Sequence, residues 1–592
     1  MGKYDSYTTG LFAIPEYEGE SKVTTLGEAI RRNVKPGMTV HMSQDARAAA
    51  CEVIRQFHGT RPGLTLVVSV MGQHALNVVH AGLLKKLITT NASDLFPAPG
   101  PSAIIQRAFK DKTVEIESWS LLSLLQRFMA GALDVPFMPT KSLAASSMAE
   151  HNKGDYVPMD DPFGSGRSVG VVRALQPDAS IIHGWAADPY GNTITMPVDG
   201  DGIWGAKAAK NPVIVTVERI VSTDFIRAHA PLVKIPGHMV GAVCHVPFGA
   251  HPGGILNRLL PAEFQPYTQD REFIVAHRNA SQKPETLDAW LKEWVLDVRD
   301  HEDYLKKLGS DKLLWLRGRA QADSWEVEMR SQADTVSESP EYNASELMVI
   351  AAARQLIERM PQRGHRVVLT GIGTGGLAAF LAYYKLREKG YTIALTIGSG
   401  YFGYAPRPGS PTQSDYANTS TSQMLSDGLD IYGVVVAGPK NASIGILGAG
   451  QIDKHGNINS TRLSADTYLT GAGGGNDAAS TARECMAVVP QSKRRFMEQV
   501  PYISMPGRSV NVLVSNRGIF QKLGDSQELV LTHCLPDPAT PSLDKRIEAI
   551  RANCGWELNV APKVEDVPPP TVEELTAVRL LDPRKEFIGP RG

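Results

Sequence analysis

The pattern of apolar and polar positions predicts strands and helices that alternate along the chain. In one stretch, an apolar strand is followed by a glycine turn, a segment with helical spacing and a second apolar strand. The same order occurs near the start of the chain. The predicted strand, helix and strand are 367–370, 377–388 and 392–397 in one stretch, and 39–42, 46–57 and 64–70 in the other. Such alternation is typical of an α/β fold with a mainly parallel sheet.

Two glycine-rich turns follow the strands of the later stretch. The first is Gly371 to Gly376, and the second is Gly398-Ser399-Gly400. Open α/β sheets bind ligands at the carboxyl ends of their strands, because free N–H groups of turns and helix starts gather there. We therefore expect a ligand site at these turns, and a purely structural turn is the alternative. The predicted binding residues here are Gly373, Thr374, Gly375, Gly398 and Gly400.

A repeated motif indicates that the chain contains two homologous halves. An apolar strand runs into Asp188-Pro-Tyr-Gly-Asn192 in the first half and into Asp453-Lys-His-Gly-Asn457 in the second. Asp and Asn side chains favour tight turns, and the Gly permits a positive φ. Together with the matching strand, helix and strand order, this motif predicts two open α/β halves in one chain. We place them at 1–281 and 343–592, joined by a helical segment and linker at 282–342.

The joining segment is predicted to begin with a helix and to end as a connector. Residues 287–308 have helical spacing, and Trp290 and Trp294 lie on the apolar face, so we expect them to pack this helix on the first half. Residues 319–342 are polar. The proline-rich end of the chain is expected to wrap the second half.

Composition excludes several classes of function. Lys and Arg number 61 and Asp and Glu 62, so the charge gives no reason to expect nucleic acid or a membrane surface as a partner. The first residues show no basic start followed by an apolar run, and no stretch reaches the length of a membrane span. The five cysteines are scattered, which fits reduced thiols and no metal site. We therefore expect a cytoplasmic protein.

Several motifs, in order, resemble those of the glutaconate-type family I CoA-transferases. The second half resembles their β subunit, whereas the first half resembles their α subunit, so the chain looks like the two subunits fused. The carrying segments in the second half are 371–376, 450–461, 470–477 and 493–496. Those in the first half are 131–137, 175–178, 183–192 and 247–252. The resemblance implies two CoA-transferase-like halves, an acyl-CoA thioester as substrate and an active site between the halves.

The resemblance also identifies a departure at the catalytic position. In the transferases, a glutamate at the end of a β-subunit strand attacks the thioester and carries CoA as a covalent intermediate. That position falls on Gly398, which has no side chain. Other members of the superfamily lack this glutamate, namely ring-opening hydrolases of steroid catabolism and a decarboxylase of a branched acyl-CoA. The endings Thr396-Ile397-Gly398 and 217–221 look closer to those of the steroid hydrolases.

Hydrolysis of a carbon–carbon bond in a β-keto acyl-CoA needs a base and donors that hold the enolate. Glu117, near a strand end, is the candidate base, with a salt-bridged strand glutamate as the alternative. The resemblance places the catalytic glutamate of the hydrolases closer to Ser120. Ser399 is a candidate nucleophile, although no His is adjacent to it in sequence, and a role in the turn is the alternative.

Further candidates lie in two other loops. His251 is a candidate acid, base or donor, with a structural loop histidine as the alternative. Asn476 and Asp477 are candidates for holding the thioester oxygen or pantetheine, with a capped helix start as the alternative. The set of predicted CoA-binding residues is completed by Gln451, Gly474 and Gly475.

We therefore expect an enzyme that acts on an acyl-CoA, as a carbon–carbon hydrolase or decarboxylase that keeps CoA attached. One alternative is a genuine CoA-transferase that uses another carboxylate, such as Glu117, and a second is an acyl-CoA-binding protein without turnover. The prediction includes no metal, no cofactor beyond CoA itself and a homodimer of fused chains. The acyl group is not predicted.

Overall fold

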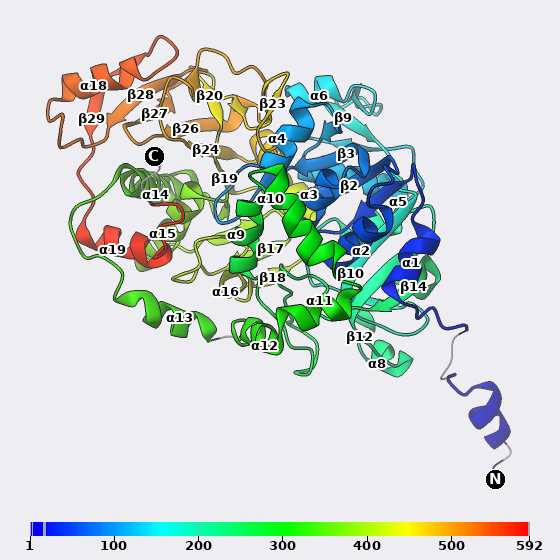
Figure 1. Ribbon diagram of the computed structural model, residues 1–592. Helices are drawn as coiled ribbons and strands as arrows, with labels where there is room; N and C mark the ends of the chain where they lie inside the picture. Colours follow the sequence, from blue (N-terminus) through cyan, green and yellow to red (C-terminus); the bar gives the residue numbers. More distant parts are fainter. Residues whose placement is uncertain (1, 3, 16–18, 199, 322, 590–592) are drawn as a thin grey trace.

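The computed structural model describes residues 2, 4–15, 19–198, 200–321 and 323–589. It contains one large sheet in each half of the chain, of nine strands in the first half and ten in the second. Figure 1 shows the first half in blue to turquoise and the second half from light green through yellow to red, with the helices of the joining segment in green. The short helix η1 (Tyr7–Leu11) stands away from the rest of the molecule.

The two sheets share one central topology. In the first sheet, five parallel strands lie in the order β2, β1, β10, β12 and β14, and in the second the order is β16, β15, β19, β24 and β26. The first set is β1 (Thr39–Met42), β2 (Leu64–Val70), β10 (Ala179–Ala187), β12 (Val213–Ile220) and β14 (Val240–His245). The second set is β15 (Val367–Leu369), β16 (Ala394–Ile397), β19 (Ser443–Leu447), β24 (Glu484–Val488) and β26 (Val510–Val514). The predicted pair of homologous α/β halves is confirmed.

The repeated Asp-x-x-Gly-Asn motif forms the same turn in both halves. Asp188 accepts hydrogen bonds from the N–H of Asn192 at 2.9 Å and from its amide at 2.8 Å. Asp453 does the same with Asn457, at 3.0 and 3.1 Å. In each half the Asn oxygen then accepts an N–H from a distant glycine, Gly237 or Gly507, so the turn fastens a second loop.

The strand and helix boundaries follow the apolar pattern closely. β1 and β2 have the predicted bounds, and α2 (Arg47–Phe57) begins one residue after the predicted start. α15 (Thr374–Glu388) begins three residues before its predicted start, because Gly373 with φ 108° ends the turn and lets Thr374 open the helix. The apolar core of this half packs α15 and α14 (Ala344–Arg363) against the sheet.

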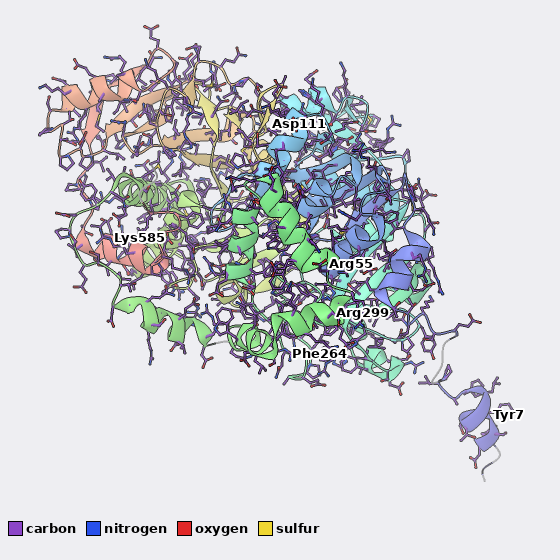
Figure 2. The ribbon with its side chains drawn as sticks, in the orientation of Figure 1. Tyr7, Arg55, Asp111, Phe264, Arg299 and Lys585 are labelled. Atoms are coloured by element: carbon purple, nitrogen blue, oxygen red, sulfur yellow. The ribbon has the colours of Figure 1, made fainter. Side chains whose placement is uncertain are left out.

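The joining segment divides between the two halves. α9 (Arg271–Ala280), α10 (Pro284–Leu291), α11 (His301–Leu308) and α12 (Ser310–Gly318) pack on the first half, where Leu287, Leu291 and Leu316 join its apolar clusters. Figure 2 shows Arg55 of α2 beside these helices, and its guanidinium donates to the carbonyl of Val295. α13 (Ser324–Ala333) contacts the second half, where Glu328 pairs with Arg584 at 3.0 Å.

The single helix predicted over 287–308 is interrupted. After α10 the chain forms a short π-helix, η4 (Lys292–Leu296), and α11 starts anew because the Asp300 side chain caps it through the N–H of Asp303. The predicted packing is confirmed, since Trp290 and Trp294 both contact Phe273 edge to face. At the end of the chain, β29 (Val560–Asp566) pairs with β28 (Leu529–Cys534), and α19 (Val572–Leu581) packs on α14 and α15. Within the described residues, no helix combines the length and the apolar character needed to cross a membrane.

Candidate active site between the two halves

The halves meet where the loop Gly471–Asp477 of the second half lies on strand ends of the first. The Gly473 N–H donates to the carbonyl of Thr90 at 2.9 Å, and the Gly473 carbonyl accepts the N–H of Leu121 at 3.1 Å. Thr90 belongs to β3 (Leu84–Asn91), and Leu121 opens α5 (Leu121–Ala132) directly after β6 (Glu115–Ser118). Both are carboxyl ends of parallel strands, which is where ligands bind in open α/β sheets.

The two glycine turns lie at the same edge of the second sheet. Strands β15 and β16 are adjacent and parallel, so the turns that follow them, 371–376 and 398–400, are neighbours. Gly400 has φ 134°, and a Cβ there would lie 3.1 Å from Val198 of the first half. Ser399 is partly exposed, as are Gly371, Thr374 and Gly375, so this edge keeps accessible backbone. The structure thus brings together the predicted residues Gly373, Thr374, Gly375, Gly398 and Gly400.

Asn476 and Asp477 hold the halves together with their side chains. The Asp477 carboxylate accepts the Ser142 hydroxyl at 2.6 Å and the Leu122 N–H at 3.0 Å. The Asn476 oxygen accepts the N–H of Leu143 at 2.9 Å, and its amide donates to the carbonyl of Ser504. These bonds occupy the polar atoms that we expected to contact a thioester. Helix α17 (Gly475–Thr481) begins here with Gly474 as its N-cap. The Gly475 N–H donates to the carbonyl of Ala472 at 2.9 Å, whereas the Gly474 N–H has no acceptor among the described residues and remains available as a backbone donor.

Gly398 lies against an aromatic ring that no pattern in the sequence predicted at this position. Tyr432 comes from the π-helix η5 (Leu429–Val436), and its side chain is 4% exposed. A Cβ atom on Gly398 would overlap the phenol oxygen of Tyr432, and so would a Cβ atom on Gly474. The phenol therefore fills the slot between two glycine backbones, and a residue with a side chain at 398 has no room.

The remaining site candidates of the second half are Ser399 and Gln451. The Ser399 hydroxyl makes no hydrogen bond with any residue in the described ranges, so the base that a serine nucleophile needs is not beside it. The Gln451 side chain is 9% exposed, accepts the Asn459 amide at 2.9 Å and donates to the carbonyl of Arg494 at 3.4 Å. Gln451 thus links loops of its own half.

Glu117 is held in a network of cations in the first half. Its carboxylate accepts the indole N–H of Trp119 at 2.6 Å, pairs with Lys86 at 2.6 Å and pairs with Arg127 at 3.0 Å. Burial alone would raise the pKa of Glu117, but the bonds from Lys86, Arg127 and Trp119 bring the pKa below its ordinary value. A carboxylate held this way is a weak base. This geometry matches the alternative interpretation, a salt-bridged strand glutamate.

His251 connects its loop to the joining helices. One ring nitrogen lies 2.6 Å from the Tyr304 hydroxyl and the other 3.3 Å from the Asp270 carboxylate, and the residue is buried. Burial lowers the pKa of His251 even though Asp270 opposes the change. Because both nitrogens have partners, the structural alternative fits His251 better than contact with a substrate.

A buried network beside it orders the same loop. Glu218, at the end of β12, accepts the Tyr267 hydroxyl at 2.9 Å and the N–H of Phe248 at 2.9 Å, and it lies 3.0 Å from the His183 ring. Phe248 has φ 56°, a conformation that is uncommon for a bulky residue and that these bonds hold in place. The network fixes the loop that faces the end of β10.

Asp45 is the carboxylate that sequence reasoning did not select. It follows β1 at its carboxyl end, and its side chain accepts no hydrogen bond from the described residues. Burial raises the pKa of Asp45, although the nearby charge of Arg47 opposes the change. Its negative charge also contributes, after burial, to a raised pKa of Tyr401 in the second half. Asp45 therefore lies near enough to the junction to affect Tyr401, and its carboxylate oxygens accept no hydrogen bond from the described residues.

In the sequence, Asp45 was distinguished only by its position after a predicted strand. Asp45 follows β1 as Gly371 follows β15, at equivalent strands of the two halves. The Arg47 guanidinium donates to the Gln73 amide oxygen at 3.2 Å and to the carbonyl of Gln44, so it influences Asp45 through its charge and not through a hydrogen bond. Among the residues that the structure describes, no cluster of three or more His, Cys, Asp or Glu suits a metal ion.

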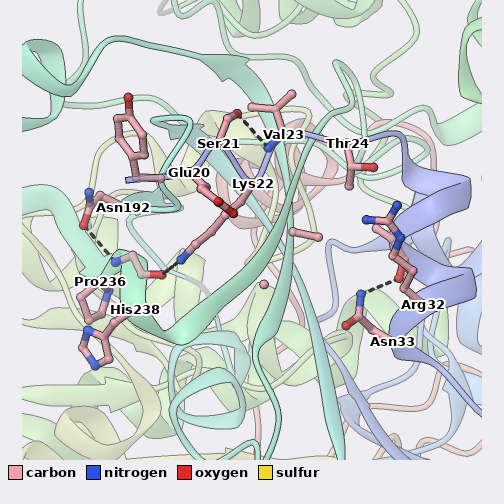
Figure 3. A pocket seen from close by; sticks show the side chains of 15 residues that line it. Glu20, Ser21, Lys22, Val23, Thr24, Arg32, Asn33, Asn192, Pro236 and His238 are labelled. Carbon is pink, nitrogen blue, oxygen red and sulfur yellow. Dashed lines mark hydrogen bonds between the residues drawn. The ribbon is translucent and has the colours of Figure 1, made fainter. Parts of the chain in front are cut away.

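A separate surface pocket of about 690 Å³ is lined by residues of the first half alone (Figure 3). It lies between the segment Glu20–Thr24, helix α1 (Leu26–Asn33) and the loop Pro236–His238. The Lys22 ammonium donates to the carbonyl of Gly237 at 2.6 Å and fastens the N-terminal segment to the sheet. The pocket contains no residue of the second half, so it is distinct from the junction.

Comparisons with known proteins point to one family. Residues 23–245 match the family model described as Coenzyme A transferase. One of the subunits of a glutaconate CoA-transferase from Acidaminococcus fermentans is 29% identical over 50% of this chain and 95% of its own length. One of the subunits of a 3-oxoadipate CoA-transferase from Pseudomonas knackmussii is 27% identical over 41% of this chain and 94% of its own. The crystal structure of an acyl-CoA transferase from Escherichia coli, a thioester complex with CoA, covers 94% of this chain and 97% of its own, with a TM-score of 0.62 at 14% identity.

Proposed function

Because the chain belongs to the coenzyme A transferase family, with regions like both kinds of transferase subunit in one polypeptide, we propose that it cleaves a carbon–carbon bond in a β-keto acyl-CoA with water and leaves the thioester intact. The observation that carries this proposal is the slot at Gly398. By the resemblance, position 398 corresponds to the nucleophilic glutamate of the transferases. Here the Tyr432 phenol occupies the space of any side chain at that position. Covalent transfer of CoA from this position has no nucleophile.

Asp45 supplies the base for the proposed reaction. Its carboxylate takes a proton from water, and the hydroxide adds to the β-carbonyl carbon of the substrate. The bond between this carbon and the α-carbon then breaks, and its electron pair moves onto the α-carbon as the enolate of the thioester. The enolate then takes up a proton. A cyclic substrate gives one product with a new carboxylate and an intact CoA thioester, and a linear substrate gives a free carboxylic acid and a shorter acyl-CoA. Water provides all the added atoms, so no further reactant is needed.

The raised pKa of Asp45 suits this role, because a stronger base removes a proton from water more readily. Glu117 is less suitable, since its pKa is lowered and its oxygens are occupied by Lys86, Arg127 and Trp119. The free N–H groups of the glycine turns and of the start of α17 provide donors for the thioester oxygen or the CoA phosphates.

The test is product analysis with a panel of linear, cyclic and unsaturated β-keto acyl-CoAs, with and without acetate as acceptor, in water enriched in heavy oxygen. The proposal expects a product that forms without acceptor, keeps CoA and carries labelled oxygen in a new carboxylate. Release of carbon dioxide without label would indicate decarboxylation instead. A new acyl-CoA formed only with acceptor, together with a CoA adduct on the protein, would establish CoA transfer and refute the proposal.

A further inference from the structure

Tyr432 combines a buried ring with a hydroxyl that no protein group among the described residues occupies. Its side chain is 4% exposed, yet its hydroxyl makes no hydrogen bond with any part of the chain that the structure describes. The Tyr432 oxygen is not among the fully buried polar atoms that lack a partner, so the hydroxyl keeps access to the space outside the ring pocket. The buried Tyr404 and Tyr468 of the same half instead donate to or accept from protein groups, at 2.8 and 3.0 Å. The Tyr432 hydroxyl is therefore free to donate to an acceptor that enters this space.

The position of the hydroxyl indicates where that acceptor lies. The phenol oxygen lies against the backbones of Gly398, at the end of β16, and Gly474, at the start of α17. Gly474 is partly exposed, so the slot opens toward accessible space at the junction of the halves. Leu122 and Ile431 pack against the ring and fix it, and η5 is a π-helix, a geometry often found at functional sites.

The charge state of the phenol also restricts its role. Burial, and after it the negative charge of Asp477, raise the pKa of Tyr432, so the hydroxyl keeps its proton at physiological pH. A protonated hydroxyl in a region with little water is a strong donor to an oxygen that gains negative charge during a reaction. It is a poor general base and a poor nucleophile.

We propose that the Tyr432 hydroxyl, in the slot between Gly398 and Gly474, donates a hydrogen bond to the thioester oxygen of the acyl-CoA and holds this oxygen when it becomes an enolate. This inference rests on the proposed function, since it names the donor that the enolate requires. It also explains why glycines stand at 398 and 474, because any side chain there would displace the phenol. Tyr432 is then a catalytic residue in contact with the substrate.

The test uses Tyr432→Phe, which keeps the ring and removes only the hydroxyl. Removing one donor of this kind typically lowers kcat by a factor of about 10² to 10³, and the effect on KM is expected to be small. The matched control is Tyr391→Phe, because the half-buried Tyr391 donates its hydroxyl to the carbonyl of His365 at the opposite, amino end of β15. The control is expected to lose some stability and to keep kcat.

A second readout does not depend on turnover. Acetoacetyl-CoA is a β-keto acyl-CoA whose enolate absorbs in the near ultraviolet, so a titration with pH reports how strongly the protein favours the enolate. We expect the bound enolate fraction at a given pH to be about tenfold or more lower in Tyr432→Phe than in the unmodified protein, since a charge-assisted hydrogen bond contributes about 1.5–3 kcal/mol. Tyr391→Phe should match the unmodified protein.

The outcomes separate the two proposals. An equal enolate fraction in Tyr432→Phe and the unmodified protein, or no enolate on either, would overturn the role of Tyr432. A bound enolate fraction that is lower in Tyr432→Phe than in the unmodified protein, without cleavage of any β-keto acyl-CoA, would uphold the role of Tyr432 and refute carbon–carbon hydrolysis. A double-mutant comparison tests the slot itself. Gly398→Ala should strongly destabilise the unmodified protein, because the new methyl group displaces the Tyr432 ring. The same change should cost much less stability in a Tyr432→Ala protein, in which the ring is absent.

Discussion

Asp45 and Glu117 show how surroundings decide which carboxylate can act as a base. Both follow or end strands of the first sheet, and both are partly buried. Glu117 accepts bonds from three donors, whereas Asp45 accepts none from the described residues. The same burial therefore produces a lowered pKa in the compensated carboxylate and a raised pKa in the uncompensated one.

This contrast predicts the pH dependence of the enzyme. The base must be ionised, so kcat/KM should be lost as the pH falls through the pKa of Asp45, at a pH above that of an ordinary aspartate, which titrates at about 3.9. Asp45→Asn should lower kcat/KM by a factor of about 10² to 10⁴. The measurement is kcat/KM against pH for the β-keto acyl-CoA turned over in the product screen.

The unfolding temperature of the Asp45→Asn variant provides the control for this prediction. A carboxyl group whose pKa is raised by folding destabilises the folded protein when it is ionised, so Asp45→Asn should not lower the unfolding temperature at neutral pH. Asp178→Asn is the matched variant, since Asp178 holds the opposite end of β1 through the N–H of Thr39. It should lose stability and keep the acid limb of activity. An Asp45→Asn variant that is both unstable and active would contradict the assignment.

The residues of the junction could be predicted from sequence only in part. The glycine turns are visible in the sequence, because glycine permits a tight turn and a close approach of the backbone. The five predicted positions, four glycines and Thr374, lie at one edge of the sheet. Tyr432 and Asp45 carry no comparable signal. Tyr432 lies 34 positions from Gly398 in sequence, and its part in the slot arises only when η5 folds over β16. His251 and Asp477 had the expected residue types, but partners from distant segments occupy their polar atoms.

Helix α14 is attached to the second sheet through one buried carboxylate. Glu484 of β24 is 1% exposed, accepts the Arg359 guanidinium at 2.6 Å and accepts the ring N–H of His365 at 2.9 Å. Burial alone would raise its pKa, but His365 and Arg359 lower the pKa of Glu484 to about 2. Neither Arg359 nor Glu484 was expected to pair from sequence, because 125 positions separate them.

This ion pair predicts an acid-sensitive second half. A lowered pKa contributes stability that is present above the pKa of an unfolded glutamate, about 4.3, and is lost as the pH falls toward 2. The contribution is about 3 kcal/mol, since each pKa unit corresponds to about 1.4 kcal/mol. Glu484→Gln should lower the urea midpoint at pH 7 and reduce its dependence on pH between about 5 and 3.

The exposed Glu358 of the same helix provides the comparison. Glu358→Gln removes a carboxylate whose only hydrogen-bond partner among the described residues is the Gln362 side chain, at 3.3 Å. Its stability should stay within a few tenths of a kcal/mol of the unmodified protein at both pH values. Equal pH profiles for Glu484→Gln and the unmodified protein would show that the pair does not stabilise α14.

The regular strands and helices were more predictable than the segment that joins the halves. Parallel strands buried on both faces are rich in apolar residues, and both β1 and β2 have the predicted bounds. The segment 287–308 keeps its apolar periodicity across a break, and the break depends on a single cap, Asp300. Periodicity alone cannot distinguish one long helix from two that share a face.

The two halves are organised like two separate polypeptides joined by a linker, because each half has its own large sheet. The glutaconate and 3-oxoadipate CoA-transferase relatives are single subunits, which match 50% and 41% of this chain. The helices up to α12 pack on the first half, and α13 contacts the second, so the connection crosses between Gly318 and Ser324. Trp204 of the first half also donates to Asp427 of the second at 3.0 Å, beside the contacts of Gly473 and Asp477.

This arrangement predicts that the chain can be divided without loss of the active site. Polypeptides 1–321 and 322–592, expressed together, should purify as a one-to-one complex with the kcat of the intact chain, because every contact of the junction lies outside the cut. Activity should decline on dilution, since the linker no longer provides a high effective concentration.

Asp477→Ala in the second polypeptide is the control, because it leaves the N–H of Leu122 and the Ser142 hydroxyl without their acceptor and should weaken the complex. Polypeptides that fold separately and do not associate would show that the junction depends on the covalent connection.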